Sequence, residues 1–177
     1  MNAPTVAPID SSQKTKVIGR TNQLVEEAVA MFKMPLRPIL VRFDLRGRSA
    51  GMFRVRDLQP EIRYNPWIFA RFFESNMAQT IPHEVAHYVV YLLFGRHGVK
   101  PHGKEWRKVM LAFGCVPRTT CDYDLHGIPV RRLRRYSYRC NCSDHQVSSI
   151  RHNRMVKYHI QYLCRVCGQP LKQQDDL

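Results

Sequence analysis

The chain has 177 residues, of which 44% are hydrophobic and 10% aromatic, and 28 Lys and Arg against 14 Asp and Glu give it a formal net charge of +14. This composition excludes general disorder and suits one domain, or one domain with a small appendage. The longest central apolar run, Tyr88 to Phe94, is far too short to cross a membrane. The first twelve residues lack the apolar core of a secretory signal, so we expect a cytoplasmic protein with reduced cysteines and no membrane association.

The N-terminal segment 1–15 is rich in Pro, Ser and Thr and has no hydrophobic period, which predicts a flexible tail. Asn22 to Met34 then follows the pattern of an amphipathic helix. Thr21 is a candidate N-cap, and Pro35 ends the helix.

Three short runs rich in β-branched or aromatic residues come next, at Ile39–Leu45, Met52–Val55 and Glu61–Tyr64. Turn-forming residues separate them, which predicts a small antiparallel sheet. We expect the segment Glu61–Asn65 to offer an edge strand to an extended peptide.

Three helices are predicted in the middle of the chain, at Pro66–Phe73, Thr80–Phe94 and Gly103–Phe113. Pro82 is tolerated in the first turn of the second helix, and Gly95 stops it.

The second of these helices carries an HExxH motif, His83-Glu84-Val85-Ala86-His87. Residues four apart lie one turn apart on the same face, so both imidazoles can reach one Zn²⁺. The carboxylate of Glu84 lies beside that face, where it can take a proton from metal-bound water and later give it to a leaving amine. An amphipathic helix with two ordinary histidines is the alternative interpretation of the motif alone, but the apolar remainder of the helix favours a buried metal site.

A catalytic zinc usually takes three protein ligands and leaves a fourth position for water. We favour His102 as the third ligand, because a chain that reverses after Gly95 can carry it back over the metal. His97 and Glu105 remain alternatives.

The chain resembles the SprT family in two neighbouring segments, HEVAH at 83–87 and FGRHGVKPHGKEW at 94–106. The pattern of that family is HExxH followed by His-Gly and an aromatic residue. The resemblance implies that His83, His87 and His102 are zinc ligands and that Glu84 is the catalytic acid and base. The family includes the eukaryotic Spartan proteases, which cleave proteins trapped covalently on DNA, so a DNA-bound protein is the implied substrate.

The C-terminal part contains a CxC pair, Cys140 and Cys142, and a CxxC pair, Cys164 and Cys167. Four thiolates can hold one structural zinc, and SprT proteins commonly end in a zinc ribbon. His145 could replace a cysteine in this site. The segments 136–142 and 156–171 are expected to be short strands joined by metal-binding turns. Cys115 and Cys121 lack the spacing of metal ligands. His152 is expected near the surface arginines, not in the metal site.

Much of the positive charge lies in this part of the chain, which favours nucleic acid over an anionic membrane or an acidic protein as partner. We expect Tyr136 and Tyr138 to stack on exposed bases. The arginines expected to contact phosphates are Arg131, Arg132, Arg134, Arg135, Arg139, Arg151 and Arg154.

Together these patterns predict an α+β protein: a flexible tail at 1–15, a zincin-like metalloprotease domain with an HExxH helix and short antiparallel sheet at 16–130, and a basic zinc ribbon at 131–177. We expect a monomer with one catalytic and one structural Zn²⁺ that cleaves proteins bound or crosslinked to DNA. The alternative is a non-catalytic, zinc-containing regulator that binds nucleic acid. A zinc-dependent nuclease fits less well, because the histidine spacing differs from H-x3-H-x5-H.

Overall fold

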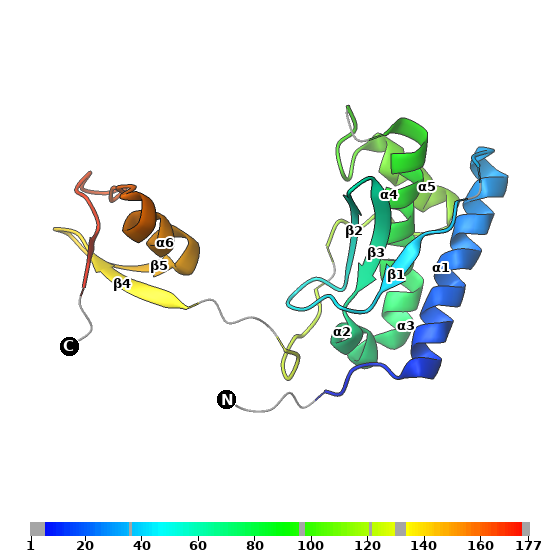
Figure 1. Ribbon diagram of the computed structural model, residues 1–177, viewed down its shortest axis with the longest axis horizontal. Coiled ribbons are helices and arrows are strands. Elements are labelled where there is room, and N and C mark those ends of the chain that lie inside the picture. Colours follow the sequence, from blue (N-terminus) through cyan, green and yellow to red (C-terminus); the bar gives the residue numbers. More distant parts are fainter. Residues whose placement is uncertain (1–5, 36, 96–97, 121, 130–133, 175–177) are drawn as a thin grey trace. The chain divides into compact units, whose positions relative to one another are not determined.

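The computed structural model describes residues 6–35, 37–95, 98–120, 122–129 and 134–174, and the chain forms two compact units, Met1–Val130 and Arg131–Leu177. Both units combine helices with a small sheet, which confirms the mixed α+β class (Figure 1). Within the described ranges, no helix is both long and apolar enough to span a membrane. Among the residues singled out from the sequence, His97, Cys121, Arg131 and Arg132 lie outside those ranges.

The first helix, α1 (Ser11–Phe32), begins much earlier than the sequence pattern indicated. Asp10 caps it by accepting a 2.8 Å hydrogen bond from the backbone N–H of Gln13, whose side chain in turn accepts from the backbone N–H of Asp10. Ile9, just before this capping box, is almost fully buried. The flexible tail predicted for 1–15 is therefore wrong from Ile9 onward, because a cap and an apolar anchor fix that segment.

Thr21, the N-cap candidate, instead lies inside α1. It is buried and donates its hydroxyl to the carbonyl of Val17, one turn earlier, at 2.8 Å. A hydroxyl that bonds within its own helix can sit in the helix interior, and the spacing of apolar residues alone does not distinguish that role from a cap.

The sheet of the first unit consists of β1 (Leu40–Arg42), β2 (Gly51–Arg56) and β3 (Gln59–Tyr64), in the order β1-β3-β2. The β2–β3 pair is antiparallel, but β1 pairs with β3 in parallel, so the prediction of an antiparallel sheet is wrong for β1. β2 begins at the end of the sheet where β1 finishes and runs back in the opposite direction, so the next strand, β3, runs parallel to β1.

The expectation that Glu61–Asn65 would be an edge strand is also wrong, since β3 is the central strand. The outer strand next to α4 is β2. Its N–H and C=O groups at Gly51, Phe53 and Val55 point away from β3, because the antiparallel ladder alternates and the neighbouring positions make the pairing hydrogen bonds.

Four helical segments lie between the sheet and the last helix of this unit: α2 (Pro66–Arg71), α3 (Phe73–Ser75), a π-helical turn η1 (Asn76–Thr80) and α4 (Ile81–Phe94). Buried Asn76 joins them: its amide donates to the carbonyl of Phe72 at 2.7 Å, and its oxygen accepts from the hydroxyl of Thr80 at 2.7 Å. The helix bearing the HExxH motif therefore starts from a fixed turn. The final helix of the unit is α5 (Lys104–Ala112).

The helices cover one face of the sheet, and the core lies between the two layers (Figure 1). Phe53 of β2 packs against Tyr88 and Tyr91 of α4, with ring centroids 6.0 and 5.8 Å apart. On the opposite face, Glu61 bridges Arg42 and Arg54 across all three strands. One layer of apolar contacts thus sets the position of α4 against β2.

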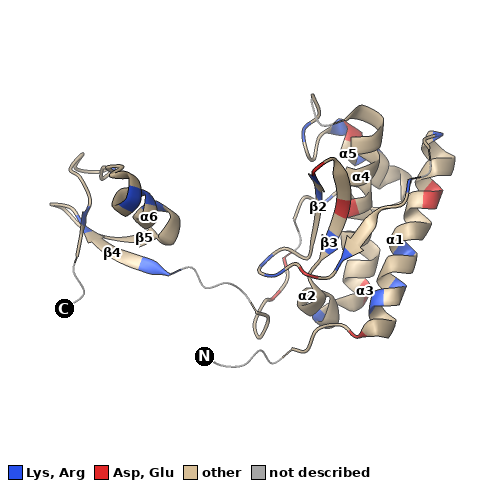
Figure 2. Ribbon diagram, viewed as in Figure 1, with Lys and Arg blue, Asp and Glu red and all other residues tan. Residues whose placement is uncertain are grey.

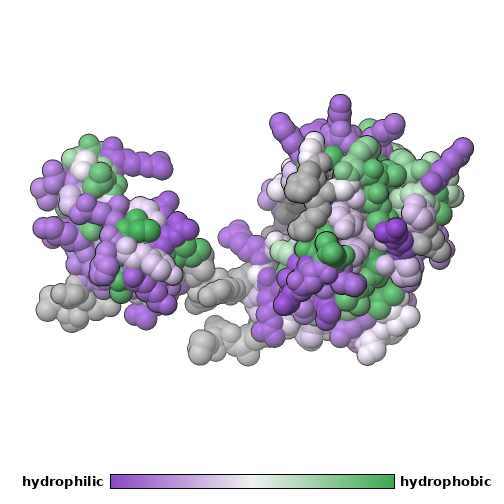
Figure 3. All heavy atoms as spheres, turned by 45° about the horizontal axis from the view of Figure 1, so that its top comes forward, coloured by the Kyte–Doolittle hydropathy of each residue, from purple (hydrophilic) through white to green (hydrophobic). Residues whose placement is uncertain are grey.

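The second unit has an antiparallel sheet of β4 (Arg135–Arg139), β5 (Asp144–Ser148) and β6 (Lys172–Gln173), in the order β5-β4-β6, and one helix, α6 (Ser149–Tyr158). Helix α6 was not predicted from the sequence, and a strand segment was expected to start at residue 156. This helix has no fully buried residue, so its sequence carries little of the apolar periodicity from which a helix is inferred. Hydrophilic side chains cover much of the surface of this unit in the view of Figure 3.

Candidate functional site

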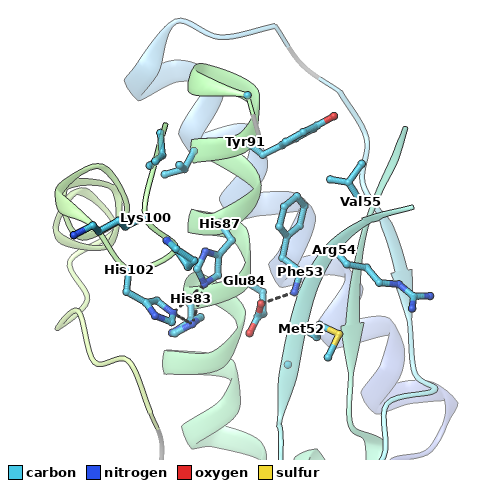
Figure 4. A pocket seen from close by; sticks show the side chains of 15 residues that line it. Met52, Phe53, Arg54, Val55, His83, Glu84, His87, Tyr91, Lys100 and His102 are labelled. Carbon is cyan, nitrogen blue, oxygen red and sulfur yellow. Dashed lines mark hydrogen bonds between the residues drawn. The ribbon is translucent and has the colours of Figure 1, made fainter. Parts of the chain in front are cut away.

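Three imidazoles from two parts of the first unit meet at one point (Figure 4). His83 and His87 lie one turn apart on α4, and His102 approaches from the connection to α5. Their Nε2 atoms are 3.1–3.2 Å from one another. Ligand nitrogens about 2.0–2.1 Å from a shared tetrahedral zinc would lie roughly 3.3 Å apart. The three histidines predicted from the sequence therefore have the spacing of a metal-ligand set.

The reversal of the chain after α4 brings His102 to this cluster. Gly95 ends α4 with a φ of 76°, a left-handed conformation that favours glycine. Glu105, one of the alternative ligands, is not part of the cluster, which contains only the three histidines among the described residues.

The indole ring of Trp106 on α5 packs against all three imidazole rings. It is fully buried, its ring centroid lies 4.7–5.7 Å from theirs, and its indole N–H donates to the carbonyl of His83 at 3.2 Å. The His83 ring also forms a hydrogen bond with the backbone of Arg118. Contacts of this kind fix the orientation of ligand rings. No role for Trp106 was predicted from the sequence, although an aromatic residue four positions after His102 on a helix was the available signal.

The environment keeps these histidines neutral. Burial lowers the pKa of His83 to about 4 and that of His87 to about 3, and the neighbouring imidazoles add to the effect. Burial also lowers the pKa of His102. A neutral imidazole has a free lone pair, so all three rings are ready to bind a metal at neutral pH.

Glu84 points from α4 toward β2 on the other side of the cleft (Figure 4). The backbone N–H of Phe53 donates a 2.7 Å hydrogen bond to Oε2 of Glu84. Burial raises the pKa of this carboxyl group to about 8, and the Phe53 hydrogen bond only partly offsets that effect. The group is thus held in one position and tuned to the pH range in which proton transfer is useful.

A cleft of about 460 Å³ runs beside the histidines and Glu84, with β2 as one wall and the segment before His102 as the other. Its sides are lined by Phe53, Val55, Val90 and Tyr91. In Figure 4 the side chain of Arg54 points away from the histidines, as alternation along β2 requires. The open edge of β2 therefore presents backbone groups to the cleft.

The second unit holds a separate cluster of four sulfur atoms, from Cys140, Cys142, Cys164 and Cys167, all within 4.8 Å of one another. The Cys140–Cys142 and Cys142–Cys164 sulfur distances are 3.4 and 3.7 Å. Sulfur ligands about 2.3 Å from a tetrahedral zinc lie roughly 3.8 Å apart. This donor set fits a closed structural metal site.

His145, the alternative ligand, lies beside this cluster, with its Nε2 3.1 Å from the sulfur of Cys140. That hydrogen bond is the main cause of the lowered pKa of Cys140, and it raises the pKa of His145. The four cysteines already supply four donors, so His145 is placed to stabilise the Cys140 thiolate.

The described arginines of the second unit are exposed and lie just before or on β4, on α6 and in the turn at 165–167 (Figure 2). Residues 131–177 contain ten Lys and Arg against three Asp. Arg139 forms an exposed ion pair with Asp144 at 3.3 Å. The structure thus places Arg134, Arg135, Arg139, Arg151 and Arg154 on one small unit.

Two aromatic residues expected to stack on bases have other contacts. Tyr138 is 2% exposed, and its hydroxyl lies 3.1 Å from Nδ1 of His152, so it is not available to a base. The ring of Tyr136 stacks on His152 with centroids 3.6 Å apart, and the guanidinium of Arg134 lies 5.0 Å from its centroid. Half-buried His152 therefore packs from α6 against the two tyrosines of β4, in place of the surface position expected.

Comparison with known proteins identifies the family of the chain. The model of the SprT-like family matches residues 21–130, which is more than half of the chain. The chain belongs to the SprT-like family. The resemblance inferred from HEVAH and the downstream His-Gly segment is thereby confirmed.

Several SprT proteins are similar over most of their length. The SprT protein of Pseudomonas syringae pv. tomato is 38% identical over 147 residues, which cover 82% of this chain and 86% of the relative. The SprT protein of Shewanella oneidensis is 32% identical over 153 residues, or 86% and 94% of the two chains. The SprT protein of an Enterobacter species is 39% identical over 130 residues, or 73% and 74%. No solved structure matches significantly.

Proposed function

We propose that the chain is a zinc-dependent metalloendopeptidase that cleaves proteins bound or crosslinked to DNA. The observation that carries the proposal is the convergence of three neutral imidazoles, with Nε2 atoms 3.1–3.2 Å apart, beside the buried carboxyl group of Glu84 and an open strand edge. Three nitrogen ligands leave a fourth coordination position for a reacting molecule.

In this proposal His83, His87 and His102 hold the ion, and Trp106 keeps their rings in place. The chemistry supplied by a bound Zn²⁺ is Lewis acidity toward a peptide carbonyl and toward water. A nearby cation favours the ionised form of Glu84, which can then accept a proton at its carboxylate. The same carboxyl group gives the proton to the departing amine, so it ends the cycle as it began.

The substrate would add to the exposed edge of β2. Gly51 and Val55 have backbone groups directed to the cleft, and Phe53 lies between them with its N–H on Glu84. An extended peptide that pairs with this edge runs past the three histidines with its main chain held by hydrogen bonds. Recognition through the main chain suits a protease with many protein substrates.

The second unit is proposed to bind DNA and keep the enzyme near its substrates. Its excess of Lys and Arg over Asp supports this role, because cations fixed on a rigid unit attract phosphates and release counterions. The cluster of four cysteines is proposed to hold a second Zn²⁺ that keeps the unit folded. The contacts of Tyr136 and Tyr138 favour phosphate contacts over base stacking as the main interaction.

The test compares the wild-type protein with Glu84→Gln on a protein crosslinked to single-stranded DNA. We expect Glu84→Gln to keep its zinc and to lose cleavage by about a hundredfold or more, because the proton acceptor is removed while the ligands remain. Glu74→Gln, the same substitution at an exposed position of α3, serves as the matched control and should cleave normally. Equal turnover by wild type and Glu84→Gln would remove the mechanism.

A substrate panel of DNA, RNA and DNA-crosslinked protein separates this proposal from its alternatives. Cleavage of the crosslinked protein alone supports the peptidase. DNA binding without any turnover would instead support the non-catalytic regulator, and cleavage of nucleic acid would support a nuclease.

A further inference from the structure

The cleft continues beyond the histidines into a second hollow of about 210 Å³. Gly51, His83 and Glu84 line both hollows, so the candidate reaction centre lies where they join. A peptide held along β2 would place the residues on the two sides of the scissile bond in different surroundings.

The walls of the two hollows differ in chemistry. Away from the histidines and Glu84, the first is lined by the apolar side chains of Phe53, Val55, Val90 and Val99, together with exposed Lys100 and with Arg54, which is paired with Glu61. The second is lined by polar ones: Arg48, Ser49, Thr80, Thr119, Thr120 and Tyr123. Arg48 is the only Lys or Arg among the described residues of the second hollow, and Glu84 is the only carboxylate.

Arg48 is available to a ligand. Its side chain is exposed and forms no ion pair with any carboxylate in the part of the chain that the structure describes. Many other arginines of this unit are already engaged, since Arg42 and Arg54 hold Glu61 and Arg63 holds Asp44. An exposed arginine that lines a polar hollow suits a carboxylate, which its guanidinium can bind with two parallel hydrogen bonds.

The far wall of this hollow is anchored to the helices and so is formed in advance of binding. Tyr123 stacks on Phe72 with ring centroids 4.6 Å apart, and its hydroxyl lies 3.2 Å from that of Ser75. Asp124, the next residue, pairs with Arg71 at 2.6 Å. A preformed wall reduces the ordering cost of binding and favours selection of one kind of side chain.

The direction of β2 decides which side of the scissile bond enters this hollow. The strand runs from Gly51, beside the polar hollow, to Val55, beside the apolar one. A peptide in the more stable antiparallel arrangement runs from the Val55 end to the Gly51 end. The residue that follows the scissile bond therefore lies next to Arg48.

We propose that Arg48 makes the protein select an acidic side chain, Asp or Glu, just after the scissile bond, with an apolar side chain before it. This inference rests on the proposed peptidase function and adds the side-chain preference of the site. It makes Arg48 a specificity residue that takes no part in the chemical step.

The test uses two fluorescent peptides that carry Leu before the central bond and either Glu or Lys after it. Binding is measured by anisotropy to zinc-loaded Glu84→Gln protein, so that no cleavage interferes. We expect the Glu peptide to bind about fivefold more tightly than the Lys peptide at low salt, and the difference to shrink as salt is added. Adding Arg48→Glu should reverse the preference.

Arg56→Glu is the matched control, because it makes the same charge change at an exposed position that lines neither hollow. It should leave the preference for the Glu peptide in place. An equal preference in the Arg48→Glu and parent proteins, or binding of neither peptide, would overturn the inference.

The same peptides offered to protein with Glu84 intact separate this inference from the proposed function. Cleavage of both peptides at equal rates would overturn the role of Arg48 and leave the peptidase standing. Binding that depends on Arg48 without any cleavage would support the polar hollow as a binding site and count against the peptidase.

Discussion

Gly51 of β2 lies directly against Glu84 of α4, with no room for a side chain between them. A methyl group on Gly51 would come within 2.7 Å of both Cγ and Oε1 of Glu84, and within 2.8 Å of Cγ2 of Thr80. The absence of a side chain at Gly51 allows β2 to approach α4 closely enough for the Phe53 N–H to reach the carboxyl group of Glu84. The position of Glu84 thus depends on a glycine far from it in the sequence.

Gly51→Ala should therefore lower the rate of peptide cleavage by about 10- to 100-fold while zinc content stays unchanged, because the added methyl displaces Glu84 without touching the histidines. Steady-state kinetics should assign the loss mainly to kcat. Gly19→Ala in α1 is the control, since a methyl there meets no atom within 4 Å. A Gly51→Ala protein with normal kcat would show that the close packing does not position Glu84.

The two ligand clusters predict two zinc ions per chain, which elemental analysis of the purified protein would measure. His102→Ala should lose one zinc and Cys164→Ser the other, because each removes a donor from only one cluster. Loss of both ions from either variant would contradict two independent sites.

The cysteine variant should also unfold its own unit. The second unit is small and has few fully buried side chains, chiefly Tyr138 and Val147 beside the cysteines, so it depends on the metal cross-link. Hydrogen exchange should show loss of protection confined to residues 134–174. Protection that persists in Cys164→Ser would show that the core of this unit suffices without the metal.

Replacement of Arg132, Arg134 and Arg135 by Ala should weaken DNA binding and flatten its dependence on salt, with a change in slope of roughly 0.9 for each phosphate that is no longer neutralised. Removal of three exposed cations from the first unit, Arg56, Lys104 and Lys108, is the charge-matched control. Fluorescence titration at several salt concentrations gives both slopes. Equal losses of affinity in the two triple variants would show that net charge, and not the arginine-rich unit, governs binding.

The buried carboxyl group of Glu61 predicts a loss of stability in acid. Burial alone would raise its pKa, but the hydrogen bonds from Arg54 and Arg42 outweigh that effect and lower it. A carboxyl group with a lowered pKa stabilises the fold above its unfolded-state pKa of about 4.5, and this contribution disappears as the pH falls through the lower folded-state value.

Glu61→Gln should therefore cost about 1–3 kcal/mol of unfolding free energy at pH 7 and lose less on acidification than the wild type does. Urea unfolding at pH 7 and below pH 4 gives both quantities. Parallel curves of stability against pH for the two proteins would show that Glu61 is not the group responsible.

The sequence alone was sufficient to predict the candidate metal ligands and the α+β class. His83 and His87 share a helix face because of their spacing, and the cysteine pairs are recognisable because metal ligands in turns need short, regular separations. These are local rules, in which the residues that matter are near one another in the chain. The SprT resemblance also depends on one continuous stretch, from His83 to Trp106.

What the sequence could not supply were the contacts between distant segments. The start of α1 depends on burial of Ile9, and the central position of β3 depends on parallel pairing with β1, neither of which leaves a periodic signal. No role for Gly51, Phe53 or Arg48 was predicted from the sequence for the same reason. Only the packing of β2 against α4 puts Gly51 and the Phe53 N–H beside Glu84, and Arg48 lines the same hollow as Glu84. A close approach between two elements is a property of the folded layers and not of either segment alone.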